Sequence, residues 1–226
     1  MRKTFLFGLI AALVTASNAS AGSPGAQIVI NEVLGSTTGA DTEFIELFNI
    51  GPLDVDISGW LIEEIESDAT SNGTVDDSWT INAGTILPAG GFFLLGNPAF
   101  ETAFGIISDQ TEPLSIENSS YTLLLSDSLG APQFSAFVND GDGVVPTGIT
   151  PDLSVGPFGP NDTEVPPGFF LNTDGGTTAS FLEFAPTPAA SATPGSTNAP
   201  TTAIPEPSSM AALALLAGAG VLRRRR

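Results

Sequence analysis

The chain has 226 residues, which is enough for one ordinary domain with its own buried core between two short terminal segments. It has 25 acidic and 6 basic residues, no histidine and no cysteine, and its formal net charge at pH 7 is -19. The lack of cysteine excludes disulfides, thiol nucleophiles and thiolate metal sites, and the lack of histidine excludes most familiar zinc sites.

The basic residues are confined to the two ends of the chain. They are Arg2, Lys3, Arg223, Arg224, Arg225 and Arg226. Residues 22–204 contain no Lys, Arg or His but hold every acidic residue except Glu206. This composition argues against nucleic acid as a partner, because phosphate binding depends on Lys and Arg. Self-repulsion of this size is screened by salt or divalent ions, which indicates a saline or calcium-containing exterior.

Residues 1–21 have the pattern of a secretory signal peptide. Two basic residues precede an apolar run from Phe5 to Val14, and small residues follow at Ala19, Ser20 and Ala21. We predict cleavage after Ala21, with Ala19 as the alternative. A permanent anchor is the other interpretation, but the run is far shorter than the roughly 20 residues that span a bilayer.

Short apolar segments, broken by Gly, Pro, Asn or Asp, fill the middle of the chain and predict many strands. None keeps helical spacing over several turns. A four-residue turn from Asp127 to Gly130 predicts a hairpin, and long loop-rich insertions are expected over 97–120 and 139–180. The predicted strands are Ile28 to Leu34, Glu43 to Asn49, Val55 to Glu63, Ser78 to Ile86, Phe92 to Leu95, Tyr121 to Ser126 and Gln133 to Val138.

Five ordered motifs in this region resemble the signatures of the lamin-tail domain. They are Ile30-Asn31-Glu32, Glu43-Phe44-Ile45-Glu46-Leu47-Phe48-Asn49, Ile57-Ser58-Gly59-Trp60, Leu87-Pro88-Ala89-Gly90-Gly91, and Thr193-Pro194-Gly195 followed by Asn198. The resemblance implies an all-β, immunoglobulin-like β-sandwich, in agreement with the strand pattern, and we assign residues 22–198 to it. The nucleic-acid roles of some relatives do not transfer, because the basic surface is absent.

Catalytic chemistry has few candidates in this domain. A serine nucleophile needs a base, and residues 22–204 contain no His or Lys. Glu43 and Glu46 are three residues apart, so on one strand they point to opposite faces. The acidic neighbours Glu63-Glu64 and Asp76-Asp77 would likewise point apart on an extended segment, and a solvated loop is expected over the polar stretch from Ser67 to Asp77. We therefore expect no enzyme activity; the alternative is a secreted carboxylate-based glycoside hydrolase, which requires two facing acids in a cleft.

The best ligand cluster for a metal ion is Asn139, Asp140 and Asp142, interleaved with glycines. Closely spaced oxygen donors suit calcium, although the run matches only part of an EF-hand loop and lacks its downstream Glu. A plain turn is the alternative, because Asp and Gly are common turn residues. Calcium is therefore the one candidate cofactor, and it would make the domain a calcium-dependent carbohydrate-binding module.

The end of the chain has a stalk-like stretch, rich in Pro, Ala, Ser and Thr, from Ala185 to Ala203. Residues 199–204 form the predicted linker. Pro205, Glu206 and Pro207 then precede an apolar helix expected over 208–222. The helix is too short to span a full bilayer at about 1.5 Å per residue. The terminal arginines, Arg223, Arg224, Arg225 and Arg226, would stop transfer at the cytoplasmic face.

This order, over residues 205–226, resembles the PEP-CTERM protein-sorting signal. The resemblance implies that an exosortase-type membrane enzyme recognises the tail and cuts near the motif, with Pro205, Glu206 and Pro207 as part of its substrate. A permanent single-span anchor is the alternative. We therefore expect an exported cell-surface or extracellular-matrix protein with a binding, adhesive or structural role. Its membrane attachment would be at least transient, and its further partners would be extracellular polysaccharide or other surface proteins.

Overall fold

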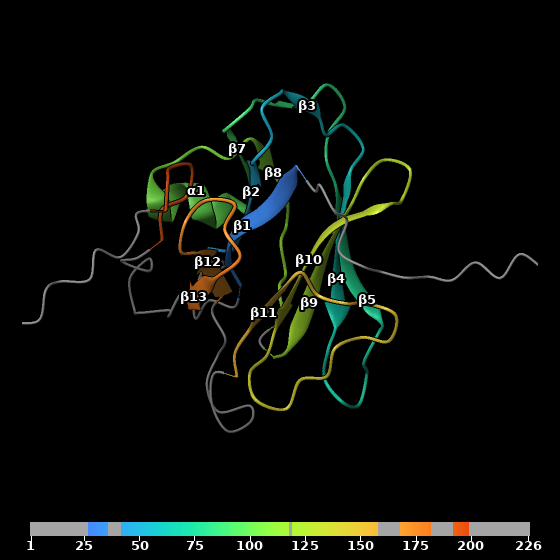
Figure 1. Cartoon of the computed structure of the whole chain (residues 1–226). Helices are drawn as coiled ribbons and strands as arrows, with labels where there is room; N and C mark the ends of the chain where they lie inside the picture. Colours follow the sequence, from blue (N-terminus) through green and yellow to red (C-terminus); the bar gives the residue numbers. More distant parts are fainter. Residues whose placement is uncertain (1–26, 36–41, 118, 158–167, 182–191, 199–226) are drawn as a thin grey trace, which may run out of the picture.

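The computed structural model describes residues 27–35, 42–117, 119–157, 168–181 and 192–198 (Figure 1). The predicted signal peptide with Ala19 and Ala21, the linker, the sorting motif and the C-terminal helix with its arginines lie outside these ranges. In the part of the chain that is described, no helix is long and apolar enough to cross a membrane.

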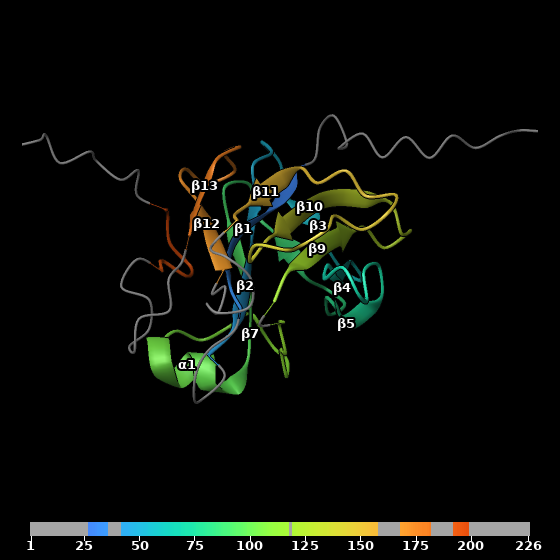
Figure 2. The same cartoon turned by 90° about the horizontal axis from the view of Figure 1, so that it is seen from below.

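Two sheets form the body of the protein, and Figures 1 and 2 show them as two layers. The first sheet has the order β13-β12-β1-β2-β7-β8 and the second has the order β11-β10-β9-β4-β5. The strands of the first are β1 (Ile28–Leu34), β2 (Phe44–Asn49), β7 (Phe92–Gly96), β8 (Gln110–Thr111), β12 (Gly168–Leu171) and β13 (Ala179–Phe181). Those of the second are β4 (Leu61–Glu66), β5 (Val75–Thr80), β9 (Tyr121–Ser126), β10 (Pro132–Val138) and β11 (Leu153–Val155).

The core lies between the inner faces of these two sheets. Alternate residues of each strand point inward, because side chains in a strand alternate between faces. Each fully buried aliphatic or aromatic side chain contributes about 1.5–3 kcal/mol. The packed sheets confirm the predicted all-β sandwich. Buried members of the core include Ile30, Val33, Ile45, Leu47 and Leu95 from the first sheet and Ile62, Trp79, Leu123, Leu125 and Ala136 from the second.

A short helix, α1 (Pro98–Phe104), covers part of the outer face of the first sheet. Asn97 caps it by accepting hydrogen bonds from the backbone N–H groups of Ala99, at 2.9 Å, and Phe100, at 3.1 Å. The Phe100 ring is fully buried with its centroid 5.0 Å from that of Phe44. The stretch 97–120 is loop-rich as expected, but the sequence did not reveal this helix, because a helix of seven residues shows no repeating apolar pattern.

The predicted strand from Val55 to Glu63 is two separate strands. β3 (Val55–Asp56) pairs with β6 (Ile86–Leu87) in a small two-stranded sheet, and β4 begins only at Leu61. A turn separates them, in which Trp60 N donates to Ile57 O at 3.1 Å and Gly59 has a φ of 71°. Glycine adopts this left-handed conformation at little cost, so the chain reverses here instead of continuing as a strand.

The second half of the domain contains one confirmed hairpin and three short strands that were not predicted. The hairpin between β9 and β10 turns at Asp127, whose carbonyl accepts the Gly130 N–H at 2.9 Å. By contrast, the expected loop-rich insertion over 139–180 contains β11, β12 and β13, and β12 pairs directly with the central strand β1. The sequence did not reveal these strands because each has only three or four residues.

Candidate functional site

Two acidic side chains face each other on the outer face of the first sheet. A register shift after Ile30 places Glu32 of β1 directly opposite Glu46 of β2, and both have an exposed fraction of 0%. The shift is a β-bulge that re-aims Asn31. The Asn31 amide donates to Glu46 Oε1 at 2.8 Å and to Asp174 Oδ1 at 3.0 Å.

The segment 192–198, called the closing segment below, covers this pair of acids. The Thr193 N–H donates to Glu32 Oε1 at 3.0 Å, and the Gly195 N–H donates to Glu46 Oε2 at 2.6 Å. The Asn198 N–H donates to Asp174 Oδ1 at 3.0 Å. The interpretation of 185–203 as an extended stalk was therefore wrong for residues 192–198, because the buried carboxylates supply acceptors for their backbone donors.

Burial also governs the protonation of the two acids. Desolvation, and next the charge of Glu46, raise the pKa of Glu32 to about 8. Desolvation raises the pKa of Glu46 to about 7, against the lowering effect of hydrogen bonds from Asn31 and Gly195. Facing acids with raised pKa values are what a carboxylate-based hydrolase needs. Here, however, both carboxyl groups are fully buried under the closing segment, so this pair has no access to water or to a sugar.

A second acidic group, called the acidic end below, lies where β4, β5 and the segment before β9 meet. It consists of Glu66, Asp76 and Glu117, with one carboxylate oxygen of each within 4.8 Å of the others. A bulge between β4 and β5 after Glu64 brings Asp76 into the group. These oxygens come from three segments, so no local motif in the sequence could have indicated the cluster.

Glu64 lies behind the acidic end and has an exposed fraction of 0%. Its Oε1 accepts the Glu117 N–H at 2.7 Å, and its buried Oε2 has no hydrogen-bond partner among the described residues. Burial, and then the charges of Glu117, Asp76 and Glu43, raise its pKa to about 8, against the hydrogen bond from Glu117. Glu63 is half-buried and Glu64 is fully buried, so these neighbours on β4 point apart, as expected for an extended segment.

The predicted calcium ligands are only partly brought together. The carboxylates of Asp140 and Asp142 lie within 4.8 Å of each other and of Asp68, a residue of the β4–β5 turn. Asn139 Oδ1 instead accepts the backbone N–H groups of Gly141, at 2.8 Å, and Gly143, at 3.0 Å, so this oxygen shapes the turn. Sequence reasoning missed Asp68 because it is distant in the chain. Calcium binding at Asp140 and Asp142 stays a prediction.

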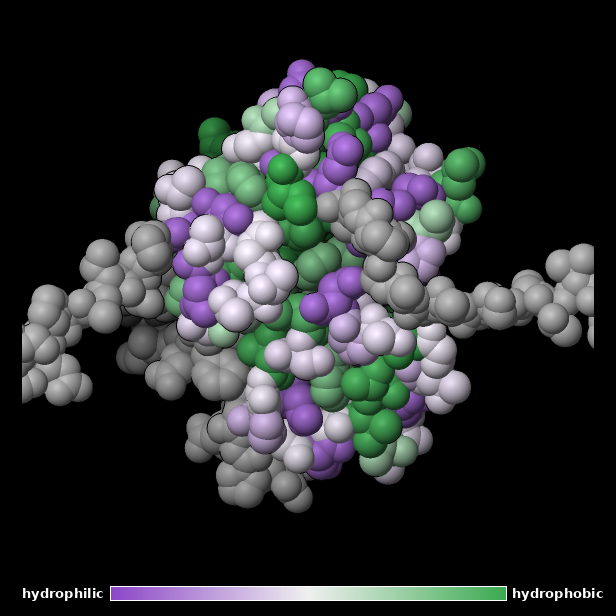
Figure 3. Space-filling view, viewed as in Figure 1, coloured by the Kyte–Doolittle hydropathy of each residue, from purple (hydrophilic) through white to green (hydrophobic). Residues whose placement is uncertain are grey.

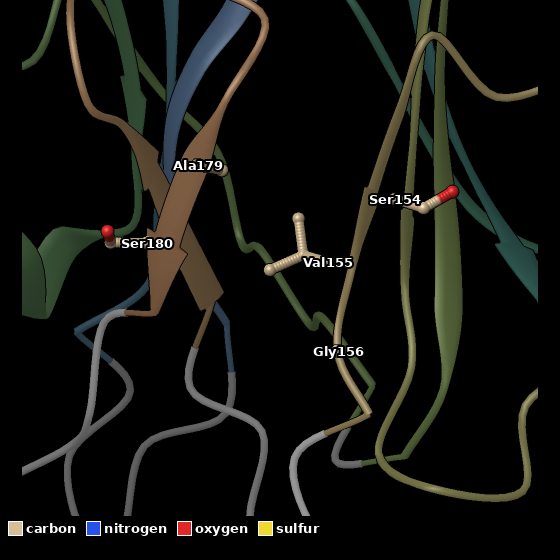
Figure 4. Close-up of a pocket in the computed structure, with 5 residues that line it drawn as sticks. All are labelled: Ser154, Val155, Gly156, Ala179 and Ser180. Carbon is tan, nitrogen blue, oxygen red and sulfur yellow. The ribbon is translucent and has the colours of Figure 1, made fainter.

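A groove of about 350 Å³ lies between β11 and β13, the edge strands of the two sheets (Figure 4). Val155 and Ala179 point into the gap, whereas the hydroxyl groups of Ser154 and Ser180 point away from it. Gly156 also lines the groove, and none of these residues is charged. The residues that line the groove include no acidic and no basic side chain.

The visible surface has no single broad apolar area. Figure 3 shows hydrophobic and hydrophilic residues interspersed over the face that is drawn. The exposed large hydrophobic residues in the described part of the chain are scattered over separate elements, among them Leu53, Ile107 and Leu129. Scattered exposure of this kind is normal for soluble surfaces and does not indicate a docking area.

Comparisons with known proteins match two parts of the chain. A family model described as Lamin Tail Domain matches residues 21–142, which is more than half of the 226 residues. A second model, described as the PEP-CTERM protein-sorting motif, matches residues 203–226. The comparison with curated proteins gave no match. Both matches agree with the resemblances in the sequence.

Proposed function

Because this chain belongs to the lamin tail domain family and ends in a PEP-CTERM sorting motif, we propose that it is an exported, non-catalytic surface protein. An exosortase recognises Pro205, Glu206 and Pro207, cuts near them, and leaves the sandwich at the cell surface or in the extracellular matrix. There the sandwich serves in binding, adhesion or structure.

The single observation that carries this proposal is the position of the sorting motif. It matches residues 203–226, and the described closing segment ends at Asn198, a few residues before this match. Apart from Arg2 and Lys3 in the predicted signal peptide, every basic residue of the chain lies in this motif, at Arg223 to Arg226. This distribution of charge supports an orientation in which the terminal arginines stay in the cytoplasm and the acidic domain lies outside the membrane.

The absence of catalysis is supported by the chemistry of the domain. Residues 22–204 supply no Lys or His as a base, and the facing pair Glu32 and Glu46 is fully buried. The groove between β11 and β13 has an uncharged lining. A binding or structural role requires none of these groups, so it is the role that the described residues support best.

Replacement of the sorting motif tests this proposal. The full chain is expressed in a bacterium that has an exosortase, either unchanged or with Pro205, Glu206 and Pro207 all changed to alanine. Mass spectrometry then identifies the C-terminal peptide of the surface-exposed protein. We expect the unchanged chain to lose its terminal arginines and the triple variant to keep them.

The matched control changes Ser208 and Ser209, the next two residues, to alanine. This control should be processed as the unchanged chain is. Identical C-terminal peptides and identical locations for the unchanged chain and the triple variant would rule out sorting through this motif and leave a permanent anchor as the better interpretation.

A further inference from the structure

The acidic end brings three carboxyl groups together, and residues 22–204 contain no basic side chain that could balance their charge. Glu66 is buried, Glu117 is half-buried and Asp76 is exposed, and their carboxylate oxygens lie within 4.8 Å of one another. Like charges at this spacing repel, most strongly where water is excluded. No Lys, Arg or His exists in residues 22–204 to neutralise them. The counter-charge must come from protons or from a cation in solution.

The Glu64 carboxylate is a second, independent observation that indicates a ligand at the acidic end. It lies two residues before Glu66 on β4, and alternate residues of a strand share a face, so it points to the same side. It is fully buried, and among the residues that the structure describes only its Oε1 has a hydrogen-bond partner, the N–H of Glu117. The free Oε2 is a buried acceptor, and leaving such an oxygen unpaired is costly.

We propose that the acidic end binds one calcium ion through the carboxylates of Glu66, Asp76 and Glu117, with the free oxygen of Glu64 behind them in contact through a bound water. Calcium takes six to eight oxygen ligands at about 2.3–2.6 Å, so oxygens that share one ion are up to about 5 Å apart. The measured spacing of within 4.8 Å therefore admits the ion.

The donor set favours calcium over magnesium. All of the donors are carboxylates on three separate segments, and Asp76 is open to solvent, which leaves positions for water. Calcium accepts such irregular coordination, whereas magnesium demands near-octahedral geometry at about 2.0–2.1 Å and keeps its waters. The ion would connect β4, β5 and the segment before β9. This site is distinct from the predicted one at Asp140 and Asp142 and does not depend on the sorting of the protein.

Calcium titration of the purified full chain tests the proposal. The protein is stripped with EDTA, and calcium chloride or magnesium chloride is added while calorimetry measures the heat of binding. Thermal unfolding is measured in EDTA and in calcium. We expect calcium to bind and to raise the melting temperature, and magnesium to do neither at equal concentration.

Two variants locate the ion, and two controls match them. D76N removes an exposed ligand charge and E117Q a half-buried one, and each should weaken calcium binding about tenfold or more. D77N makes the same change next to Asp76 but outside the cluster, so it should bind as the unchanged chain does. D142N reports on the group formed by Asp68, Asp140 and Asp142.

Three results would overturn the proposal. They are equal melting temperatures in EDTA and in calcium, an equal response to magnesium, and calcium binding that D142N removes while D76N and E117Q retain it. Because Asp76 is exposed, D76N should fold normally, and circular dichroism checks this. E117Q gives the same test from another segment.

Discussion

Glu32 and Glu46 stand opposite each other on adjacent strands, and both are completely buried. In a domain without Lys, Arg or His, no basic side chain can balance them. Their oxygens instead accept hydrogen bonds from Asn31, Thr193 and Gly195. Two segments that are far apart in the sequence, near residues 31 and 193, are thus joined in one buried network that fixes the closing segment.

Stability should increase on acidification from pH 8 to pH 5. In the folded protein the pKa values of Glu32 and Glu46 are raised to about 8 and about 7, whereas an unfolded Glu titrates near 4.5. The folded state therefore binds more protons, and its extra stability is complete below about pH 4.5 and is lost as the pH rises to about 8. Denaturant unfolding at several pH values should show a gain on the order of a few kcal/mol.

The variant E32Q separates this effect from the general loss of self-repulsion at low pH. Glutamine keeps the size and an acceptor for the Thr193 N–H but does not titrate. The charges of Glu46 and Asp174, the two acids near Glu32, both raise the pKa of Glu32. We expect a clearly smaller pH dependence in E32Q. If the dependence equals that of the unchanged chain, Glu32 is not its source.

Removal of the Thr193 hydroxyl should loosen the closing segment. This hydroxyl lies 2.6 Å from Asn198 Oδ1 and 3.3 Å from Glu32 Oε2. In T193V these acceptors lose a donor, and we expect a loss of about 1–3 kcal/mol in the free energy of unfolding, measured by denaturant titration. S196A changes an exposed hydroxyl in the same segment and should cost less than about 0.5 kcal/mol. Equal effects of the two variants would contradict this role of Thr193.

Removal of the Tyr121 hydroxyl should cost almost nothing. The ring is fully buried, and its hydroxyl has no hydrogen-bond partner among the described residues. Burial, followed by the charges of Glu64 and Glu43, raises the pKa of this phenol well above its usual value. We expect Y121F to be as stable as the unchanged chain or more stable, whereas Y121A should lose about 3–5 kcal/mol by leaving a cavity. Thermal unfolding distinguishes the two, and a large loss in Y121F would show that the hydroxyl is paired.

The close contact at Gly168 tests whether β12 is part of the domain. A Cβ at this position would lie 1.9 Å from Val33 O, and the φ of Gly168 is 141°. G168A should therefore separate β12 from β1 and cost about 3 kcal/mol or more. Gly148 also has a positive φ, of 92°, but nothing within 4 Å, so G148A should cost only about 1–2 kcal/mol. Similar losses in chemical denaturation would indicate that β12 is not packed as described.

Much of the fold could be predicted from the sequence because local patterns encode it. The strand Ile28–Leu34 is apolar and bounded by turn residues, and the Asp127 to Gly130 turn has the expected hairpin chemistry. The prediction failed where elements were too short for a pattern, as in α1 and β12. The extent of the domain to Asn198, beyond the family match that ends at residue 142, stays a proposal.

The buried acidic groups were beyond sequence reasoning for a different reason. The bulge at Asn31 decides that Glu32 faces Glu46, and a second bulge brings Asp76 to Glu66. Bulges shift strand register without an unambiguous sequence signature. The sorting tail, by contrast, could be predicted from the sequence. Its signature is local, because Pro-Glu-Pro, the apolar run and the arginines follow one another directly in the chain.

The location of the protein in cells that have or lack the exosortase tests the central proposal most directly. The unchanged full chain is expressed in both strains, and the inner-membrane, surface and medium fractions are probed with an antibody to the sandwich. We expect surface or released protein in the first strain and retention in the inner membrane in the second. The same distribution in both strains would contradict it.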